Sequence, residues 1–383
     1  MHTPEKSSEP SSEPSSEPSS ESSSESSSEQ SSRPRHGRGI AALLFALTVL
    51  VSGCSGAQAG GSGGEPTRAA ANGRAAASER AAVAEKHLAR NEVVPLEGKD
   101  PEPDLPVTVK SSDGREVTVR DASRVLPLNG GIAEIVFTLG LGDRVVGRDV
   151  TATFEQAERL PLVTKAHDVG AESVLSLRPT VVLADTDTGP KEAIDQIREA
   201  GVPVVVLDPA TELADIETRT TRVARALGVP EAGQALNDRT RKEIAAARAN
   251  LPAGRKPEVA FLYMRGSAAV YLIGGPGSGA DSLIAAAGAR DAGTGAGLKN
   301  PFTPITSEAL VKAEPDVILM MSKGLESVGG LDGLLAVPGI KETPAGMNRR
   351  VVDLEDGVLL SFGPRTPLVI DILVDRIHRT GPS

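Results

Sequence analysis

The sequence is poor in the residues from which many binding and catalytic sites are built. It has one cysteine, no tryptophan, two tyrosines, six phenylalanines and five histidines among 383 residues. A single cysteine excludes an intramolecular disulfide and any cysteine-rich metal site, and five scattered histidines make a multi-histidine metal site hard to assemble. The scarcity of aromatic residues argues against a stacking platform for single-stranded nucleic acid. The net charge of −10, without a long basic run, argues against nucleic acid as a partner in general.

The beginning of the chain has the composition of an export signal. Residues 7–32 are almost entirely Ser and Glu, which predicts a disordered preamble because such a stretch has nothing to bury. The apolar run Ile40–Val51 follows a basic patch, is too short to span a bilayer, and is typical of the core of a signal peptide. It ends in Val-Ser-Gly-Cys54, which resembles the lipobox of bacterial lipoproteins. We therefore expect a signal peptide over residues 1–53 and lipid on Cys54; the alternative is a short transmembrane anchor with an incidental cysteine.

The remaining chain divides into a tether and two similar halves. Residues 54–105 are rich in Gly, Ala, Ser and charge, which predicts a flexible, lipidated tether with a helix near Ala81–Arg90. Beyond it, short apolar runs alternate with helical patterns, which indicates parallel sheets covered on both faces. A long amphipathic stretch over residues 231–252 lies between the halves. The predicted fold class is therefore α/β, with an N-terminal lobe over residues 106–230, one long inter-lobe helix, and a C-terminal lobe over residues 253–383.

One sequence pattern occurs in both halves. Glu172 precedes Pro179 by seven residues, Glu308 precedes Pro315 by the same distance, and each proline leads into an apolar strand. Helix N-termini favour carboxylates for electrostatic reasons alone, which is the simpler explanation. The equal spacing favours a paired role for the two glutamates.

A second candidate site lies in the segment Val259–Arg265. With the period of two of a strand, Phe261, Tyr263 and Arg265 share one face. Tyr263 and Arg265 fall at the carboxyl end of that strand, where α/β sheets expose ligand sites. A phenolate is a hard donor that suits ferric iron, and a neighbouring guanidinium favours the ionised form. The alternative is a tyrosine that caps a core strand beside an unrelated surface arginine.

His167 is the histidine best placed to be a ligand. It lies in a loop between a predicted strand and the helix that carries Glu172, and Asp168 could orient its ring. Imidazole is a common ligand of ferric haem. A lone loop histidine is more often simply solvated, and the spacing by itself does not show whether His167 is a ligand or a solvated side chain.

Four segments resemble one known family: Arg124–Gly147, Gly170–Ala184, Gly274–Ala287 and Ser307–Leu319. They are similar to the cluster-A (class III) substrate-binding proteins of ABC importers, and most to the hemin-binding lipoproteins of Gram-positive bacteria. The resemblance implies two α/β lobes joined by a single long helix, hemin bound in the inter-lobe cleft, and no enzymatic activity. It also implies a monomer, lipid-anchored on the extracellular face of the cell membrane, which delivers hemin to a permease and its ATPase.

The resemblance also assigns roles to individual residues. His167 and Tyr263 become the axial ligands of the haem iron, with Arg265 supporting the phenolate. Glu172 and Glu308 become the residues that dock into arginines of the permease. The needs of hemin itself suggest further candidates. Met320 or Met321, at most one of them, would line the porphyrin pocket because both end a predicted strand. Arg148 and Arg365 are candidate contacts for the haem propionates; the alternative is that each is a solvated surface arginine.

Other functions remain as alternatives. A ferric siderophore or cobalamin on the same fold is the main one, and it would not need His167 or Tyr263 as iron ligands. The run Gly275–Ala280 mimics a dinucleotide-binding turn, but the pattern is weak. A serine hydrolase is disfavoured because His167, the one plausible catalytic histidine, has no evident nucleophile partner. A structural adhesion module would explain neither the repeated glutamate nor the candidate ligands.

Overall fold

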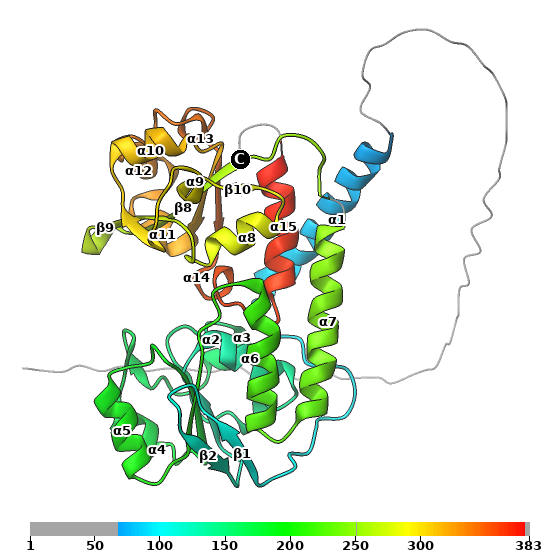
Figure 1. Cartoon of the computed structure of the whole chain (residues 1–383), viewed down its shortest axis with the longest axis vertical. Coiled ribbons are helices and arrows are strands. Elements are labelled where there is room, and N and C mark those ends of the chain that lie inside the picture. Colours follow the sequence, from blue (N-terminus) through cyan, green and yellow to red (C-terminus); the bar gives the residue numbers. More distant parts are fainter. Residues whose placement is uncertain (1–67, 250, 380–383) are drawn as a thin grey trace, which may run out of the picture. The chain divides into compact units, whose positions relative to one another are not determined.

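The computed structural model describes residues 68–249 and 251–379 (Figure 1). The predicted signal peptide, the lipobox and Cys54 lie outside the described residues. Among the helices of the described part, none combines the length and hydropathy needed to cross a bilayer.

The N-terminal lobe is built on a parallel three-stranded sheet in the order β3-β6-β7. Every residue of its central strand, β6, is buried, as expected for a parallel sheet covered on both faces. Strands β1 and β2 form an antiparallel hairpin around Asp113-Gly114, and a second, very short hairpin is formed by β4 and β5. The strands of this lobe are β1 Val107–Lys110, β2 Glu116–Val119, β3 Val125–Pro127, β4 Thr164–Lys165, β5 Asp168–Val169, β6 Val181–Asp185 and β7 Val204–Leu207.

Short helices connect and cover these strands. The first of them, α2, begins where the side chain of Asn129 accepts hydrogen bonds from the backbone N–H groups of Gly131 and Ile132, which are otherwise unpaired at a helix start. The helices of this lobe are α2 Gly130–Thr138, the 3-10 turn η1 Gly142–Arg144, α3 Glu155–Glu158, α4 Ala171–Ser176, α5 Lys191–Glu199 and α6 Leu213–Ala226.

The C-terminal lobe has a larger, mixed sheet in the order β11-β9-β8-β12-β13, with β10 also paired to β8. Strand β8 is central: it is parallel to β12 and antiparallel to β9. The strands are β8 Glu258–Arg265, β9 Val270–Gly274, β10 Arg290–Asp291, β11 Phe302–Pro304, β12 Val317–Met321 and β13 Val351–Leu354. The helices are η2 Gly266–Ala268, α8 Ala280–Ala286, α9 Ala292–Gly295, α10 Ser307–Ala313, α11 Ser322–Ser327, α12 Gly330–Leu335, α13 Pro344–Met347, α14 Asp356–Leu359 and α15 Thr366–His378.

A single long helix precedes the second lobe, as predicted. It is α7, Pro230–Arg248, and it packs against α6 of the first lobe and α15 of the second (Figure 1). Pro230 occupies its first turn, where a missing N–H costs nothing, and Pro252 lies just beyond its end. The fold class is the expected one: two α/β lobes joined by one long helix.

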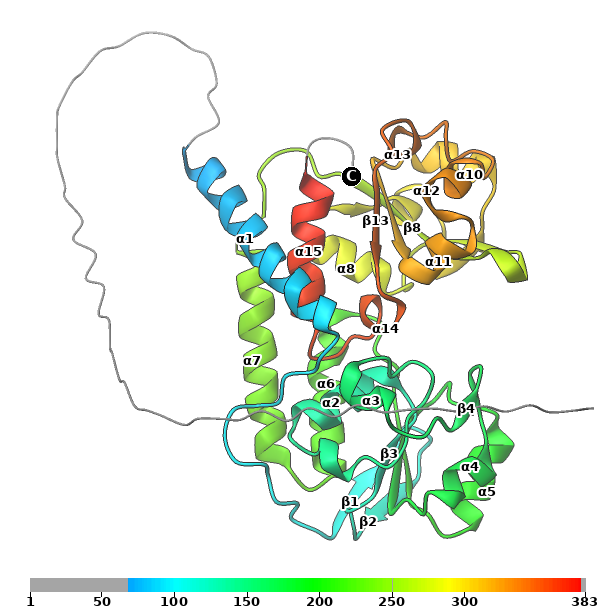
Figure 2. The ribbon, with the colours of Figure 1, turned by 180° about the vertical axis from the view of Figure 1, so that it is seen from behind.

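The prediction of a flexible tether over residues 54–105 is wrong for residues 68–105, although the helix expected near Ala81–Arg90 is present as part of a longer helix. Helix α1, Arg68–Arg90, lies along α15 (Figure 2). Ala77, Ala81 and Ala84 are buried, and Arg80 forms an ion pair with Asp371, with 2.8 Å between Nε and Oδ1. The spacing of the alanines gives the helix a narrow apolar stripe, which the abundance of polar residues around it conceals in the sequence.

The chain after α1 is held against the N-terminal lobe. Leu96 donates a backbone hydrogen bond to Thr138 (2.8 Å), and Asp104 donates one to Gly228 (2.8 Å). The N-terminal segment therefore contacts both lobes before the first strand begins.

A buried ion pair joins the two lobes. Arg365, at the start of α15, donates from Nε (2.9 Å) and Nη2 (2.6 Å) to Oε1 of Glu134 on α2, and from Nη1 to Asn91 (2.8 Å). Burial raises the pKa of the Glu134 carboxyl, and the charge of Arg365 partly offsets that effect. Gly131 allows the close approach, because a Cβ there would overlap the carbonyl oxygen of Ser361.

Candidate functional site

Tyr263 and Arg265 lie together at the carboxyl end of β8, as the strand period predicted. Phe261, two residues earlier on the same face, is fully buried, whereas Tyr263 and Arg265 are each partly exposed. The guanidinium of Arg265 lies over the ring of Tyr263, with 4.6 Å between Cζ and the ring centroid. A cation at this distance is attracted to the face of an aromatic ring.

The Arg265 guanidinium is held by three further groups. Its Nη2 donates to Oδ2 of Asp356 (2.8 Å) and lies 3.9 Å from the sulfur of Met321, and its Nη1 donates to the carbonyl oxygen of Met264 (2.9 Å). These contacts come from β8, β12 and the first turn of α14. The C-terminal lobe therefore fixes the arginine beside the phenol before any ligand arrives.

An aromatic neighbour completes this side of the site. Phe302 of β11 packs edge-on against Tyr263, with ring centroids 6.0 Å apart, and against Phe261 at 6.3 Å. Its side chain remains 36% exposed, which is unusual for a phenylalanine. Sequence reasoning missed Phe302 because it joins the group only through the pairing of β11 with β9.

His167 lies at the turn of the short β4–β5 hairpin and is exposed. The preceding residue, Ala166, has a φ of 55°, the left-handed conformation that a tight turn requires. In both views this hairpin and the β8–β9 hairpin project from the same side of the described body (Figures 1 and 2). No hydrogen bond, ion pair or ring contact links His167 to Tyr263 within the described residues.

Asp149 is an acid beside His167 that the sequence did not single out. Burial raises the pKa of its carboxyl, and hydrogen bonds from Thr151 and the charge of His167 partly offset that effect. Its Oδ1 is buried and has no hydrogen-bond partner among the described residues. Asp149 therefore supplies a negative charge near His167, and no hydrogen bond joins the two side chains among the described residues.

The predicted pocket residues fall into two groups. Met320 is fully buried in the core, whereas Met321 is partly exposed and contacts Arg265, so of the two only Met321 is placed to face a ligand beside Arg265. The prediction that Arg365 contacts propionates is wrong in this structure, because its side chain is 4% exposed and bound to Glu134. Arg148 is partly buried beside Asp149, and its Nε has no hydrogen-bond partner in the described chain. Arg148 thus stays a candidate.

Glu172 and Glu308 occupy matching positions in the two lobes. Each lies in the first turn of its helix, α4 or α10, and each side chain is exposed. Both are free of ion pairs among the residues that the structure describes. They are therefore accessible to a partner, one from each lobe.

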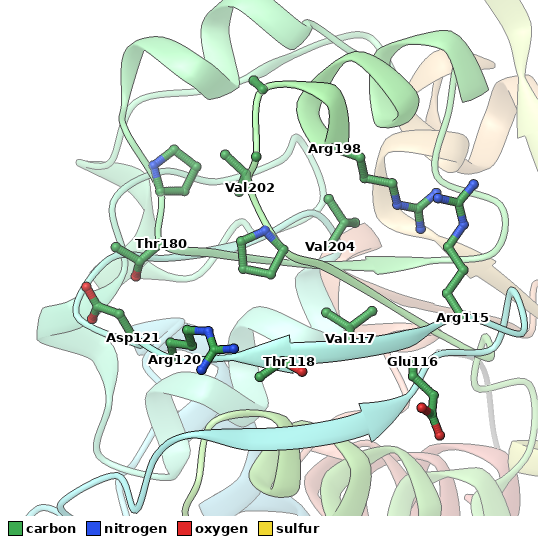
Figure 3. Close-up of a pocket in the computed structure, with 14 residues that line it drawn as sticks. Arg115, Glu116, Val117, Thr118, Arg120, Asp121, Thr180, Arg198, Val202 and Val204 are labelled. Carbon is green, nitrogen blue, oxygen red and sulfur yellow. The ribbon is translucent and has the colours of Figure 1, made fainter.

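A cavity of about 610 Å³ in the N-terminal lobe is separate from all of these residues. It lies between β2 and the loops that lead into β6 and β7, at the amino ends of those two strands (Figure 3). Arg198 on its wall is already paired with Asp113 at 2.5 Å. None of the predicted ligand residues lines it, and we do not assign it to the site.

Comparison with solved structures gives strong similarity to one group of proteins. The crystal structure of the heme binding protein HmuT matches with a TM-score of 0.71 and 38% identity, covering 75% of this chain and 94% of that chain. The periplasmic heme-binding protein RhuT from Roseiflexus sp. RS-1 matches with a TM-score of 0.64 and 41% identity, covering 67% and 100%. BhuT, solved in complex with two hemes, matches with a TM-score of 0.61 and 40% identity, covering 66% and 97%.

Sequence comparison finds more distant relatives. The ABC transporter substrate-binding lipoprotein YvrC of Bacillus subtilis (strain 168) is 24% identical over 285 residues, which is 72% of this chain and 86% of YvrC. The vitamin B12-binding protein of Yersinia pestis (strain Pestoides F) is 24% identical over 212 residues, 52% of this chain and 69% of that protein. The family model for periplasmic binding proteins matches residues 125–357, and the chain therefore belongs to the periplasmic binding protein family.

Proposed function

We propose that this chain is the hemin-binding component of an ABC importer. It binds ferric haem between its lobes through His167 and Tyr263 and delivers it to the membrane permease and its ATPase. Lipid on Cys54 holds it at the extracellular face of the membrane; the similarity to the lipoprotein YvrC supports such an anchor.

The observation that carries the proposal is the position of the Arg265 guanidinium over the Tyr263 ring, with 4.6 Å between Cζ and the ring centroid. A tyrosine oxygen is a known ligand of ferric haem, and Arg265 holds a positive charge beside this one. Phe302 and Met321 add an apolar and polarisable surface next to it, suited to a flat porphyrin. In the described residues, no group of three or more His, Cys, Asp or Glu could hold a bare metal ion. Two axial ligands are enough for haem, because the porphyrin supplies the other four.

The similar structures support the same three side chains. The HmuT structures that match this chain include alanine variants of one tyrosine, of the arginine two residues after it, and of one histidine. The spacing of that tyrosine and arginine is the spacing of Tyr263 and Arg265. The match to vitamin B12-binding proteins keeps cobalamin as a second candidate ligand, but it covers only 52% of this chain.

The test is a titration of the purified protein with hemin, followed by absorbance. We expect a ferric haem Soret band that shifts on binding and saturates. If hemin produces no spectral change, while cobalamin or a ferric siderophore binds in calorimetry, the proposed ligand is wrong and the alternative on the same fold stands.

Glu172 and Glu308 are proposed to dock into cations of the permease. Their exposure, and their equivalent positions on α4 and α10, support this role. Charge reversal in Glu172→Lys or Glu308→Lys should impair hemin uptake by cells and leave the hemin affinity of the purified protein unchanged. The exposed Glu199, at the end of α5, provides a matched control for charge reversal. A loss of hemin affinity would instead place these glutamates in the binding site or in the fold.

A further inference from the structure

Asp356 is connected to the candidate site although it lies far from β8 in the sequence. It is the first residue of α14, and its side chain is only 14% exposed. Oδ2 accepts a hydrogen bond from Arg265 Nη2 (2.8 Å), and Oδ1 accepts one from the backbone N–H of Lys323 in the first turn of α11 (3.0 Å). Both carboxylate oxygens are therefore occupied, and the side chain has little freedom to turn.

This arrangement determines where the Arg265 guanidinium lies. A long arginine side chain on an exposed strand end has many conformations, and holding one of them costs entropy. Here Asp356 holds one end of the guanidinium and the carbonyl oxygen of Met264 holds the other, and its central carbon lies over the Tyr263 ring. Neither Nε–H nor the second Nη1–H donates to another group in the described chain, so Arg265 keeps donors for a ligand.

We propose that Asp356 is a positioning residue that acts through Arg265 to support Tyr263 as an iron ligand. It does not touch the haem itself. The inference rests on the proposed hemin-binding function and adds a residue to it.

If Asp356 acted through its charge alone, removing it would have the opposite effect on hemin binding from the effect expected of a positioning residue. Asp356 is negative, so by itself it disfavours a phenolate nearby, and removing it should strengthen binding of ferric iron by Tyr263. A positioning role requires binding to weaken when Asp356 is removed, because the guanidinium is then free to leave the ring. The sign of the effect separates the two explanations.

The experiment is a double-mutant cycle with hemin affinity as the readout. Asp356→Ala should weaken hemin binding by roughly tenfold, the lower end of the effect of removing a group that orients a metal ligand. In an Arg265→Gln background, the same substitution should change the affinity by less than about twofold, because the group through which it acts is gone. Asp356→Asn keeps the size and one acceptor oxygen and should show a smaller loss.

Asp353 provides a matched control. It is a nearby acid on β13 that accepts a hydrogen bond from Ser322 Oγ (2.6 Å) and does not contact Arg265. Asp353→Asn should leave hemin affinity unchanged. Unchanged or tighter binding in Asp356→Ala, or losses that add to those of Arg265→Gln, would overturn the inference. If the wild-type protein fails to bind hemin, it is the proposed function that fails.

A second readout needs no haem. The chain has two tyrosines, so ring-labelled tyrosine gives two NMR signals, and Tyr271→Phe identifies the one from Tyr263. Asp356→Ala should move the Tyr263 signal toward its position in Arg265→Gln, and Asp353→Asn should not. A Tyr263 signal that stays in place in Asp356→Ala would show that the guanidinium does not depend on Asp356, whatever the protein binds.

Discussion

Tyr263 stands at the end of an eight-residue strand in the middle of a sheet, whereas His167 stands at the turn of a hairpin whose strands have two residues each. Tyr263 has an arginine over its ring and a phenylalanine at its edge. His167 is exposed and has a buried carboxylate, Asp149, as its charged neighbour. The two proposed ligands thus differ in how far the protein fixes them in advance.

This difference has an energetic consequence. A coordinating side chain that its neighbours already orient loses little conformational entropy when the metal binds. An exposed side chain on a turn loses more, because binding must order it. We therefore expect the C-terminal lobe to supply most of the affinity for hemin and the N-terminal lobe to supply a smaller share. Two measurements of hemin affinity examine this asymmetry, and a third examines how the stability of the N-terminal lobe depends on pH.

The largest effect is expected for Tyr263→Phe. The substitution keeps the ring and its packing but removes the oxygen that binds iron, so hemin affinity should fall by more than roughly 100-fold, the upper end of what the loss of a supporting group costs. Titration with hemin at one pH measures it. Tyr271→Phe is the control. Tyr271 of β9 lies opposite Met264 of β8, the residue next to Tyr263, so the alternation of side chains puts Tyr271 on the other face of the sheet from Tyr263. Equal losses in the two variants would refute the assignment.

The second effect concerns the N-terminal lobe and pH. Burial raises the pKa of Asp185 to about 6, and the attraction of Arg219 only partly offsets it. The Asp185 carboxyl therefore binds a proton more tightly in the folded state than in the unfolded state. Its protonated form stabilises the fold at low pH, and this contribution to stability is lost as the pH rises through about 6. The stability of the wild type relative to Asp185→Asn should fall by on the order of 2 kcal/mol between pH 4 and pH 7.

Urea unfolding of both proteins across that pH range gives the difference directly. Because other titrating groups are shared, their effects largely cancel. A difference that stays constant, or that rises with pH, would mean that Asp185 is ionised in the folded protein at low pH.

The smallest effect is expected for His167→Ala. Since the Tyr263 side of the site remains intact, we predict a loss of roughly tenfold in hemin affinity, together with a change in the ferric haem spectrum as one axial ligand is lost. The neighbouring Asp168→Ala should alter neither. A loss as large as that of Tyr263→Phe would remove the asymmetry between the lobes.

The sequence predicted the architecture well because the signals for it are local. The buried run of β6, the hairpin of β1 and β2, and the proline that opens α7 are each visible in a short window. The same holds for Tyr263 and Arg265, whose shared face follows from the two-residue period of β8.

The errors came from contacts that join distant parts of the chain. Arg365 looked like a free cation, but it is buried against Glu134, 231 residues earlier. The segment after residue 67 looked like a tether, but an alanine stripe packs α1 on α15 near the other end of the chain. Neither pairing has a local signal.

By itself, the sequence determined the fold class, the two lobes, and which residues carry a donor that suits ferric iron, because periodicity and chemistry are properties of short segments. Only the tertiary structure decided which neighbours prepare those donors. Asp356 reaches Arg265 across 91 residues, and Phe302 reaches Tyr263 through the pairing of two other strands. Such neighbours are selected by packing in three dimensions, and packing cannot be read from spacing along the chain.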